Sequence, residues 1–594
     1  MLTLLTIEDL APLQALRAEV ADLRARVAAL EVSQPVPPPV ELPPVEPPPV
    51  EPPIDTPGWP AYLSELASHP WGQYSINHAD TYEWVSHHVM AWKLTGNTAY
   101  RDDAITFLLR DIPFQPASRN DSREGTIEIV LWYEALREHM TAEQRADFEA
   151  RLRNWAEGML GKYGDSHGTR LGDSDEVIGH YFGIRMIDRA LGTDYSSQPG
   201  MNGSGSVAEM REAIKGFIAL AEGGEWIEAG QGYNYGTLQL LLMGVREFPG
   251  EYPEVEAWLP QCAQQLVWHV TSDGKDSVQW GDVEDPHGSP LYKWVAVASM
   301  LLAMDADKTG DLLKAFVART RGLEPKAYGY NITRCLYAID PRTIVDDGST
   351  LPNPQGFRVS KIGLLLYRKG DTLVQVQAPG KGQYDHYQSS TAFRMYDGGE
   401  WLVDYPLGYL FEPVNQAYAF GFPAMGGFQE MTEASETADG FVVAWRTGGV
   451  LRDPRFYWSP PVFVEELSIR LEYTHSTRSI SVTCKLTGAP PPDPKPMSEG
   501  GLFYPYELER ITAAKAPLEV IQHAPTEPTP IEGGFTWQTK GGRTVAMRTT
   551  AGGQVEKVAG NPSLRGNYHT QEVEGWMVRL MDEAEANYIV EPKQ

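Results

Sequence analysis

The chain has 594 residues, more than one ordinary hydrophobic core accommodates, so its length predicts two large domains with accessory segments. The formal net charge of -29 at pH 7 argues against nucleic acid as a partner, because phosphate-binding surfaces are basic. The three cysteines lie far apart and form neither a disulfide framework nor a zinc motif, and no apolar run reaches the roughly 18 residues that a membrane-spanning helix needs.

Residues 1–31 carry a short heptad pattern of apolar side chains flanked by charged ones. The apolar positions are Leu13, Leu16, Val20, Leu23, Val27 and Leu30. Alternating spacings of this kind predict a parallel coiled coil, and hence a homo-oligomer. A single amphipathic helix packed on the rest of the chain is the alternative. The opening MLTLLTIEDLAPL has early acids and no basic region or cleavage site, so we expect no signal peptide.

Residues 32–57 are dominated by proline, in the run PVPPPVELPPVEPPPVEPPIDTP. Repeated proline fixes φ and removes amide donors, which predicts an extended polyproline II spacer. At about 3.1 Å per residue, such a spacer holds the coil well away from the folded body of the chain. A coil joined to a stiff spacer is typical of an anchoring stalk.

Residues 58–345 are predicted to be helical, because apolar residues recur there at helical spacing and glycine or proline usually closes each run. The predicted helices cover residues 81–96, 99–112, 128–140, 142–160, 177–192, 206–224, 235–248 and 292–304. Paired helices over this length predict an (α/α) toroid, with a long helical repeat array as the alternative. No repeat of fixed period is visible, which weighs against the common solenoids.

Residues 346–594 change to a period of two, with strands divided by Gly, Asp and Pro turns. The predicted strand regions are 357–369, 372–379, 391–405, 441–449, 463–488, 535–550 and 574–583. Short strands of this number predict an antiparallel β-sandwich. Helices first and strands second indicate a multidomain α+β chain rather than an alternating α/β fold.

Two segments combine the residue types that carry chemistry. The first, GQYDHYQSSTAFRMYDGGEWLVDYPLGY, covers residues 382–409 and predicts a hairpin that presents His386 and Asp404 on neighbouring strands. The second, GGEWIEAGQGYNYGTLQLLL, covers residues 223–242 and places Tyr233 at the start of a helix. A tyrosine in such a position is commonly a stacking or hydrogen-bonding residue.

These two segments and the domain order resemble the heparinase II/III-like polysaccharide lyases, which combine an (α/α) toroid with a β-sandwich. The resemblance implies cleavage of a uronic-acid-containing glycan by β-elimination. It implies Tyr233 as the general acid and His386 as the base, with Asn234 standing where the family often has a histidine. His180 and Arg394 would neutralise the uronate carboxylate.

The resemblance also implies substrate-binding residues around these groups. They are Glu176, Asn234, Tyr235, Trp280, Arg394 and Tyr409. Glu176 and His180 are four residues apart, on one face of a predicted helix, and can form an acid–imidazole pair; a histidine satisfied at a helix interface is the alternative. Trp280 opens the acid-rich run QWGDVEDPHGSP, which is also compatible with a calcium-like site or an ordinary acidic turn.

The chain departs from the family pattern at Gln388, where relatives carry a second histidine that helps an aspartate hold a structural zinc. Because glutamine is a poor zinc ligand, we expect no metal and no cofactor, and we expect Asp404 to be a structural hydrogen-bond acceptor. The Asn-His pair that relatives place on the inner wall of the toroid is also replaced, by the run that contains Asp175, Glu176 and His180.

Two other functions stay open on the sequence. A toroid glycoside hydrolase would use paired carboxylates drawn from Glu124, Glu128, Glu225, Glu228 and Asp282. A glycan-binding or virion structural protein would need no catalyst at all. The strong acidity suits a hydrolase slightly better, because an acidic polysaccharide requires a local basic cleft. The expected partners are an acidic polysaccharide, further copies of the chain and a virion or cell-surface anchor, so we expect an extracellular or virion-associated protein.

Overall fold

The computed structural model divides into two compact units, Met1–Val50 and Glu51–Gln594, and every residue that it describes lies in the second. The described residues are 81–111, 125–160, 174–198, 215, 231–278, 291–304, 306–319, 337–339, 344–360, 363–378, 393–404, 417–418, 422–423, 428–452, 462–487, 509–510, 518–550, 554–559, 576–582 and 585–593. The predicted coiled coil and proline-rich spacer lie outside them and stay predictions.

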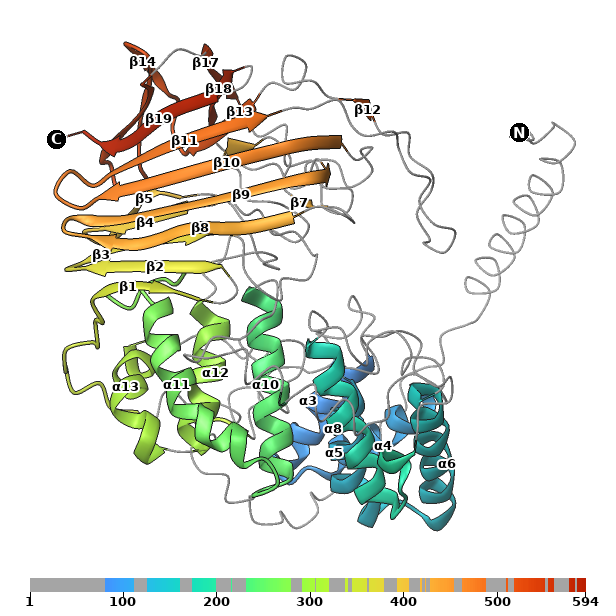
Figure 1. The fold of residues 1–594 in the computed structure, drawn as a ribbon. Coiled ribbons are helices and arrows are strands. Elements are labelled where there is room, and N and C mark those ends of the chain that lie inside the picture. The colour runs from blue at the N-terminus through green and yellow to red at the C-terminus, as the bar shows by residue number, and fades with distance from the viewer. Residues whose placement is uncertain are drawn as a thin grey trace, which may run out of the picture. The chain divides into compact units, whose positions relative to one another are not determined.

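Helices occupy the first part of the described chain (Figure 1). They are α3 (Thr81–Thr95), α4 (Thr98–Asp111), α5 (Thr126–Leu136), η3 (Arg137–His139), α6 (Ala142–Gly158), α8 (Ser174–Leu191), η5 (Tyr195–Ser197), α10 (Gln231–Glu247), α11 (Pro253–His269), α12 (Leu291–Met304) and α13 (Ala306–Arg319). Neighbours pack in the order α3, α5, α8, α10, α12, α13. Closure of this series into a toroid stays a prediction.

The sequence prediction of helices is confirmed in every predicted segment except 206–224, where only residue 215 is described. Local chemistry explains the boundaries. Before α6, the Thr141 side chain accepts a hydrogen bond from the Gln144 amide while the Gln144 side chain accepts one from the Thr141 amide, which forms a capping box. Helices α11 and α13 were not predicted. Pro260 lies inside α11 and Gly310 inside α13, and both residues weaken a helical pattern.

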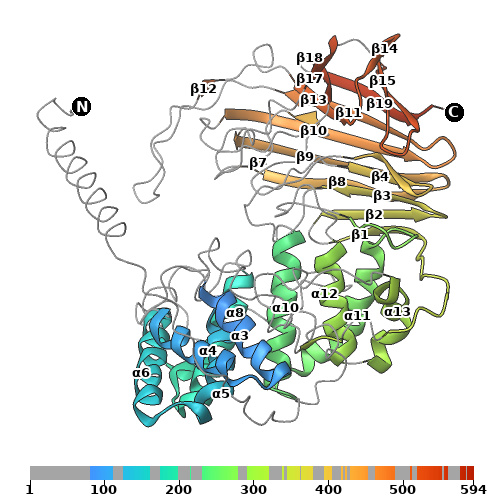
Figure 2. The same cartoon turned by 180° about the vertical axis from the view of Figure 1, so that it is seen from behind.

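Strands occupy the second part of the described chain and form three sheets (Figure 2). The first sheet contains, in spatial order, β1 (Gly356–Val359), β2 (Leu364–Lys369), β3 (Thr372–Gln377), β4 (Phe393–Asp397) and β5 (Glu400–Val403). Helices followed by antiparallel strands confirm the predicted α+β class at this level.

The second sheet has ten strands and the third has four. The second follows the order β14 (Thr529–Ile531), β15 (Gly534–Gln538), β16 (Thr544–Thr549), β19 (Glu585–Pro592), β11 (Ser479–Thr487), β10 (Val462–Thr474), β9 (Gly440–Arg452), β7 (Phe422–Pro423), with β12 (Glu509–Arg510) beside β10 and β8 (Phe428–Thr437) beside β9. The third follows the order β17 (Gln554–Ala559), β18 (Trp576–Asp582), β13 (Leu518–Ala524), β6 (Ala417–Tyr418). The β10–β12 pair is parallel, and the other recorded pairs are antiparallel.

The first sheet is a middle layer with a hydrophobic core on each face. Leu364, Leu366 and Leu373 belong to the core of the helices. Their neighbours Leu365 and Val374 belong instead to the core shared with the second sheet. Successive residues of a strand point to opposite faces, so both faces of this sheet are buried. The alternation Val-Gln-Val-Gln in β3 therefore marks two buried faces rather than one buried and one exposed face.

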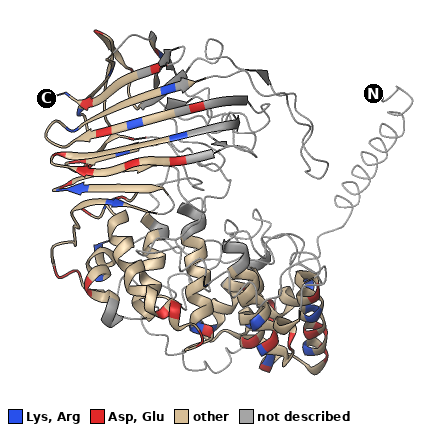
Figure 3. Cartoon of the chain, in the orientation of Figure 1, with Lys and Arg blue, Asp and Glu red and all other residues tan. Residues whose placement is uncertain are grey.

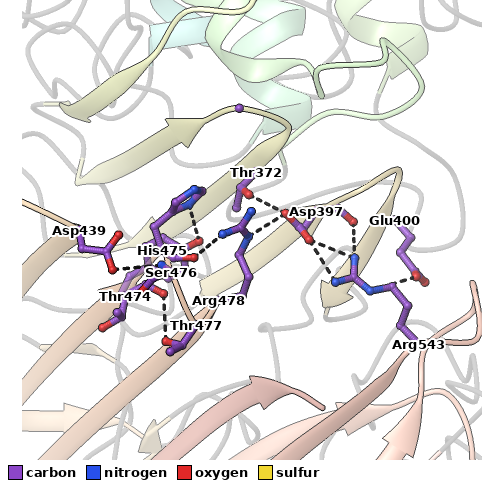
Figure 4. A network of polar contacts seen from close by, with 12 residues as sticks. Thr372, Asp397, Glu400, Asp439, Thr474, His475, Ser476, Thr477, Arg478 and Arg543 are labelled. Carbon is purple, nitrogen blue, oxygen red and sulfur yellow. Dashed lines mark hydrogen bonds and ion pairs between the residues drawn. The ribbon is translucent and has the colours of Figure 1, made fainter. Parts of the chain in front are cut away.

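The β4–β5 hairpin turns at Gly398 and Gly399, whose φ angles of 59° and 93° suit a two-residue turn that few other residues adopt. This confirms the turn predicted from the Asp-Gly-Gly run. Beside the turn, Asp397 accepts hydrogen bonds from Thr372 Oγ1 at 2.6 Å, Arg478 Nε at 3.0 Å and Arg543 Nη1 at 3.1 Å (Figure 4). The carboxylate thus ties the hairpin turn to the β10–β11 and β15–β16 turns of the second sheet.

Replacing Asp397 with Asn should lower the free energy of unfolding by about 1.5–3 kcal/mol at pH 7, because hydrogen bonds to a charged acceptor are lost. Burial by itself raises the pKa of Asp397, but the hydrogen bonds from Thr372 and Arg478 and the arginine charge lower it below its ordinary value of 3.8. A carboxyl whose pKa is lower in the folded state stabilises above its unfolded-state pKa and loses that effect as pH falls. Urea unfolding at pH 7 and pH 3 should therefore show a smaller difference between the two proteins at pH 3; an equal difference contradicts the assignment.

Candidate functional site

A short hairpin at the end of α11 lies against the first sheet. It covers residues 269–278 and is held by the Val278 amide donating to the His269 carbonyl at 2.7 Å and by a bridge between Val270 and Ser277. Inside it, Thr271 Oγ1 donates to Asp273 Oδ1 at 2.8 Å. We call this segment the 269–278 hairpin; the first sheet contacts it, and the end of α11 before it, through polar groups.

Two aromatic side chains of the β4–β5 hairpin bind carboxylates of the 269–278 hairpin. The Tyr396 hydroxyl donates to Asp273 Oδ2 at 2.8 Å, and Trp401 Nε1 donates to Asp276 Oδ2 at 2.7 Å. Burial and the Asp273 carboxylate both raise the pKa of Tyr396. Burial would raise the pKa of Asp273, but the hydrogen bonds from Thr271, Tyr396 and Lys275 lower it. The carboxylate therefore stays ionised and the phenol stays protonated at neutral pH, as this bond requires.

Arg394 lies between these two pairs and is 2% exposed. Its Nε and Nη2 atoms lie 2.8 and 2.7 Å from Asp404 Oδ1, and its Nη1 donates to the Ser277 carbonyl at 3.3 Å. The guanidinium also stacks on the Trp401 ring, with its central carbon 3.6 Å from the ring centroid. One buried cation thus contacts both strands of the hairpin and the 269–278 hairpin.

Arg368 on β2 binds the end of α11 from the same face of the sheet. Its Nη1 and Nη2 atoms donate to the carbonyls of Val267 and Val270 at 2.9 and 2.5 Å. Carbonyls in the last turn of a helix have no partner within the helix, so the guanidinium satisfies groups that would otherwise be buried without a bond. Burial lowers the pKa of Arg368 to about 10, which leaves the side chain charged at neutral pH.

His269 connects this junction to the first turns of α10. Its Nδ1 lies 3.2 Å from the Tyr235 hydroxyl and its Nε2 lies 2.8 Å from Gln265 Nε2, with all three side chains buried. Burial, followed by the charges of Arg358 and Arg368, lowers the pKa of His269 from 6.5 to about 3. The imidazole is therefore neutral and can donate through one ring nitrogen while it accepts through the other.

The contacts of Arg394, Arg368 and His269 form a frame at the junction of the helices and the first sheet. Three segments that carry predicted site residues adjoin this frame. Residues 379–392, with His386, end one residue before Phe393 and two before Arg394, and residues 405–416, with Tyr409, begin directly after Asp404. Residues 279–290, with Trp280, begin two residues after Ser277. Because Arg394 contacts both Asp404 and Ser277, the described ends of all three segments are brought together.

The sequence matches no family model and no curated protein. Solved structures do match. Heparinase III has a TM-score of 0.55 at 8% identity, over 86% of this chain and 76% of that chain. Chondroitin AC lyase of Streptomyces coelicolor A3, solved in complex with chondroitin sulphate, has a TM-score of 0.54 at 12% identity, over 90% of this chain and 79% of that chain. The chain has the fold of these polysaccharide lyases.

The structure describes some of the predicted site residues fully, some by their backbone alone and some not at all. Tyr233 and Asn234 stand at the start of α10 and Glu176 in α8, but their side chains are outside the described part. His386, Trp280 and Tyr409 lie outside the described residues altogether. His180 is buried in α8, on the same helix as Glu176, as predicted.

Tyr235 and Arg394 were predicted to bind substrate, and both are fully buried with polar partners inside the protein. A side chain with almost no exposed surface cannot contact a polysaccharide, so these two residues support the site rather than line it. Sequence reasoning missed His269, Arg368, Tyr396 and Trp401. The last two lie within the 382–409 segment, so the resemblance already pointed to their hairpin; a lone histidine and a strand arginine gave no signal.

Among the described residues, no cluster of three or more His, Cys, Asp or Glu side chains suits a metal ion, and no described helix has the length and apolar character of a membrane span. Asp404, the expected counterpart of the family's zinc-binding aspartate, has its carboxylate engaged by the Arg394 guanidinium. With Gln388 in place of a histidine, these residues do not fit a structural zinc.

Replacing His269 with Gln should change how stability depends on pH. In the unfolded wild-type chain His269 takes up a proton below its ordinary pKa of about 6.5, whereas in the folded protein it stays neutral down to about pH 3. The free energy of unfolding of the wild type therefore decreases as the pH is lowered from about 6.5 to about 3. The stability advantage of the wild type over the Gln variant should shrink by about 2 kcal/mol from pH 7 to pH 5, given about 1.4 kcal/mol per pH unit. Urea unfolding at the two pH values measures this, and parallel pH profiles of the two proteins would rule out a neutral buried His269.

Proposed function

We propose that the protein is a polysaccharide lyase that cleaves a uronic-acid-containing glycan by β-elimination. The observation that carries the proposal is the fold, shared over 86% of this chain with heparinase III and over 90% with chondroitin AC lyase. The two segments that resemble the heparinase II/III-like lyases supply independent support, because both are attached to one frame. Residues 382–409 contain Arg394, and residues 223–242 contain Tyr235, the partner of His269.

In β-elimination, a base removes the proton on C5 of the uronate and the electron pair forms a double bond between C4 and C5. The C4–O4 bond breaks, an acid protonates the departing oxygen, and no water is consumed. Neutralisation of the carboxylate makes the C5 proton more acidic. In our proposal Tyr233 is the acid and also the base for one epimer, and His386 is the base from the sandwich. His180 is 1% exposed, so the carboxylate-neutralising role expected for it from the sequence is not assigned to it.

The distribution of charged residues bears on how so acidic a chain would bind an acidic polysaccharide. Acidic and basic residues crowd α4 and α6, whereas α10 and α12 near the junction carry few of either sign (Figure 3). Arg368 and Arg394 place two positive charges under the junction itself. The carboxylates of Asp404, Asp273 and Asp276 lie at the same junction and balance these charges, so the attraction of an acidic ligand to a chain of net charge -29 has to come from other basic groups than these two.

A toroid glycoside hydrolase, the alternative to a lyase, has less support from the described residues. Of its candidate carboxylates only Glu128 is described, and it is 1% exposed within the core of α5, where a glycan does not reach. Glu124, Glu225, Glu228 and Asp282 lie outside the described residues. We keep the homo-oligomer, the coiled-coil stalk and an extracellular or virion-associated location as parts of the proposal that rest on the sequence alone.

Incubation with a panel of uronate polysaccharides should raise ultraviolet absorbance with at least one polymer, because the product of elimination is an unsaturated uronate. Replacing Tyr233 with Phe should lower this rate by about 10²–10⁴-fold, the usual contribution of a general acid or base. The matched control is Tyr133→Phe, which removes a hydroxyl from a buried tyrosine that bonds to Glu149 at 2.7 Å in α5 and α6; it should leave the rate unchanged.

The outcomes separate the alternatives. Flat absorbance together with new reducing ends would indicate hydrolysis. Undiminished absorbance in the Tyr233→Phe protein would exclude Tyr233 as the acid while leaving lyase activity standing. Binding without any product would favour a non-catalytic glycan-binding protein.

A further inference from the structure

Arg394 joins its own strand to two other parts of the chain. It lies on β4, its Nε and Nη2 bind Asp404 after β5 at 2.8 and 2.7 Å, and its Nη1 binds the carbonyl of Ser277 at 3.3 Å. Ser277 is 117 residues away in the sequence and belongs to the 269–278 hairpin. The arginine is 2% exposed, so these contacts are made away from water, where electrostatic bonds are strong.

Each of these three parts is the described end of a segment that carries a predicted site residue. His386 lies in the segment 379–392, which ends just before Arg394. Tyr409 lies in the segment that follows Asp404, and Trp280 lies in the segment that begins just after Ser277. We propose that Arg394 is a positioning residue, whose guanidinium fixes the described ends of these three segments relative to one another and so helps to place the proposed base His386 and the proposed substrate-binding residues Trp280 and Tyr409. The proposal deepens the lyase assignment and rests on it for its effect on catalysis.

The chemistry of the side chain explains why an arginine occupies this place. A guanidinium is planar, stays charged and offers five donors in a fixed fork, so it can bind a carboxylate and a carbonyl at the same time. It also stacks on an indole, as it does on Trp401 at 3.6 Å. An ammonium group on a lysine lacks both the fork and the flat face, so lysine can keep the charge but not this geometry.

The opposite end of the β4–β5 hairpin supplies a matched comparison. There Asp397 is bound by Arg478 and Arg543, which are also ion pairs across separate segments (Figure 4). That anchor ties the hairpin to turns of the second sheet, and none of the predicted site residues lies on those turns. Breaking it should therefore cost stability without disturbing the reacting groups.

The experiment compares Arg394→Gln and Arg394→Lys with Asp397→Asn in the full chain. For Arg394→Gln we expect kcat to fall about 10- to 100-fold, because an error near 1 Å in the placement of a reacting group has an effect of this size, and KM to rise as the substrate-binding residues are displaced with it. Arg394→Lys should recover part of the loss through its charge. Asp397→Asn should lower the urea midpoint and leave kcat within about twofold of the wild type, since uniform destabilisation below the unfolding threshold does not alter a site. Equal kcat losses at the two anchors would overturn the proposal.

A second readout does not depend on activity. Hydrogen–deuterium exchange should be faster in all three segments, 279–290, 379–392 and 405–416, in Arg394→Gln and unchanged there in Asp397→Asn. Faster exchange in one segment alone, or in none, would overturn the positioning role even if the protein is a lyase. If no polysaccharide is cleaved but the three segments respond together, the proposed function fails and the positioning role stands. Should Arg394→Gln not fold, Asp404→Asn weakens the same pair while it keeps the guanidinium, and the same outcomes apply.

Discussion

The first sheet is buried on both faces, and its polar side chains must therefore find partners inside the protein. Arg368 and Arg394 reach from this sheet to main-chain carbonyls of Val267, Val270 and Ser277 in the helical region. A buried cation whose bonds are broken costs several kcal/mol, so a displaced arrangement of sheet and helices is strongly disfavoured. Hydrophobic contact alone would tolerate sliding of one layer over the other, since it has no direction. The two arginines fix the register between the layers.

The candidate site depends on that register. From α10, the contacts run through Tyr235 to His269, along the 269–278 hairpin, and through Asp273, Asp276 and Ser277 to the β4–β5 hairpin. The links between the three parts are hydrogen bonds, and the 269–278 hairpin that joins them is itself held by the bond from the Val278 amide to the His269 carbonyl. Functional groups on segments whose ends are held by such contacts are positioned more precisely than groups on loops whose ends are not held. If Tyr233 and His386 are the acid and the base, as we propose, these contacts would link the helical and the strand regions that carry them.

The sequence predicted local structure well and long-range contacts poorly. The apolar periodicity of α8 and α12 and the Asp-Gly-Gly turn before β5 are local properties, and each was predicted correctly. In contrast, Gln375 and Gln377 alternate with valine and predict one solvated face, yet both are buried, because the helices cover a face that no local pattern reveals. Arg394 was predicted to line the cleft for the same reason: its burial depends on Ser277, 117 residues away. The proposed reacting residues rest on the resemblance alone, since composition cannot distinguish a catalytic tyrosine from a stacking one.

The low identity to the solved lyases, 8% and 12%, limits what the fold can carry over. A core keeps its shape when apolar residues of similar volume replace one another, so the fold survives almost complete replacement of the sequence. Catalysis has no such freedom, because each role demands a particular functional group at a particular place. On the proposed function, the departures at Asn234, Gln388, Glu176 and His180 therefore bear on the substrate and the route of proton transfer rather than on the architecture. Under the proposed lyase function, a chain that keeps the fold while these groups change should differ from the solved lyases in the polymer that it cleaves.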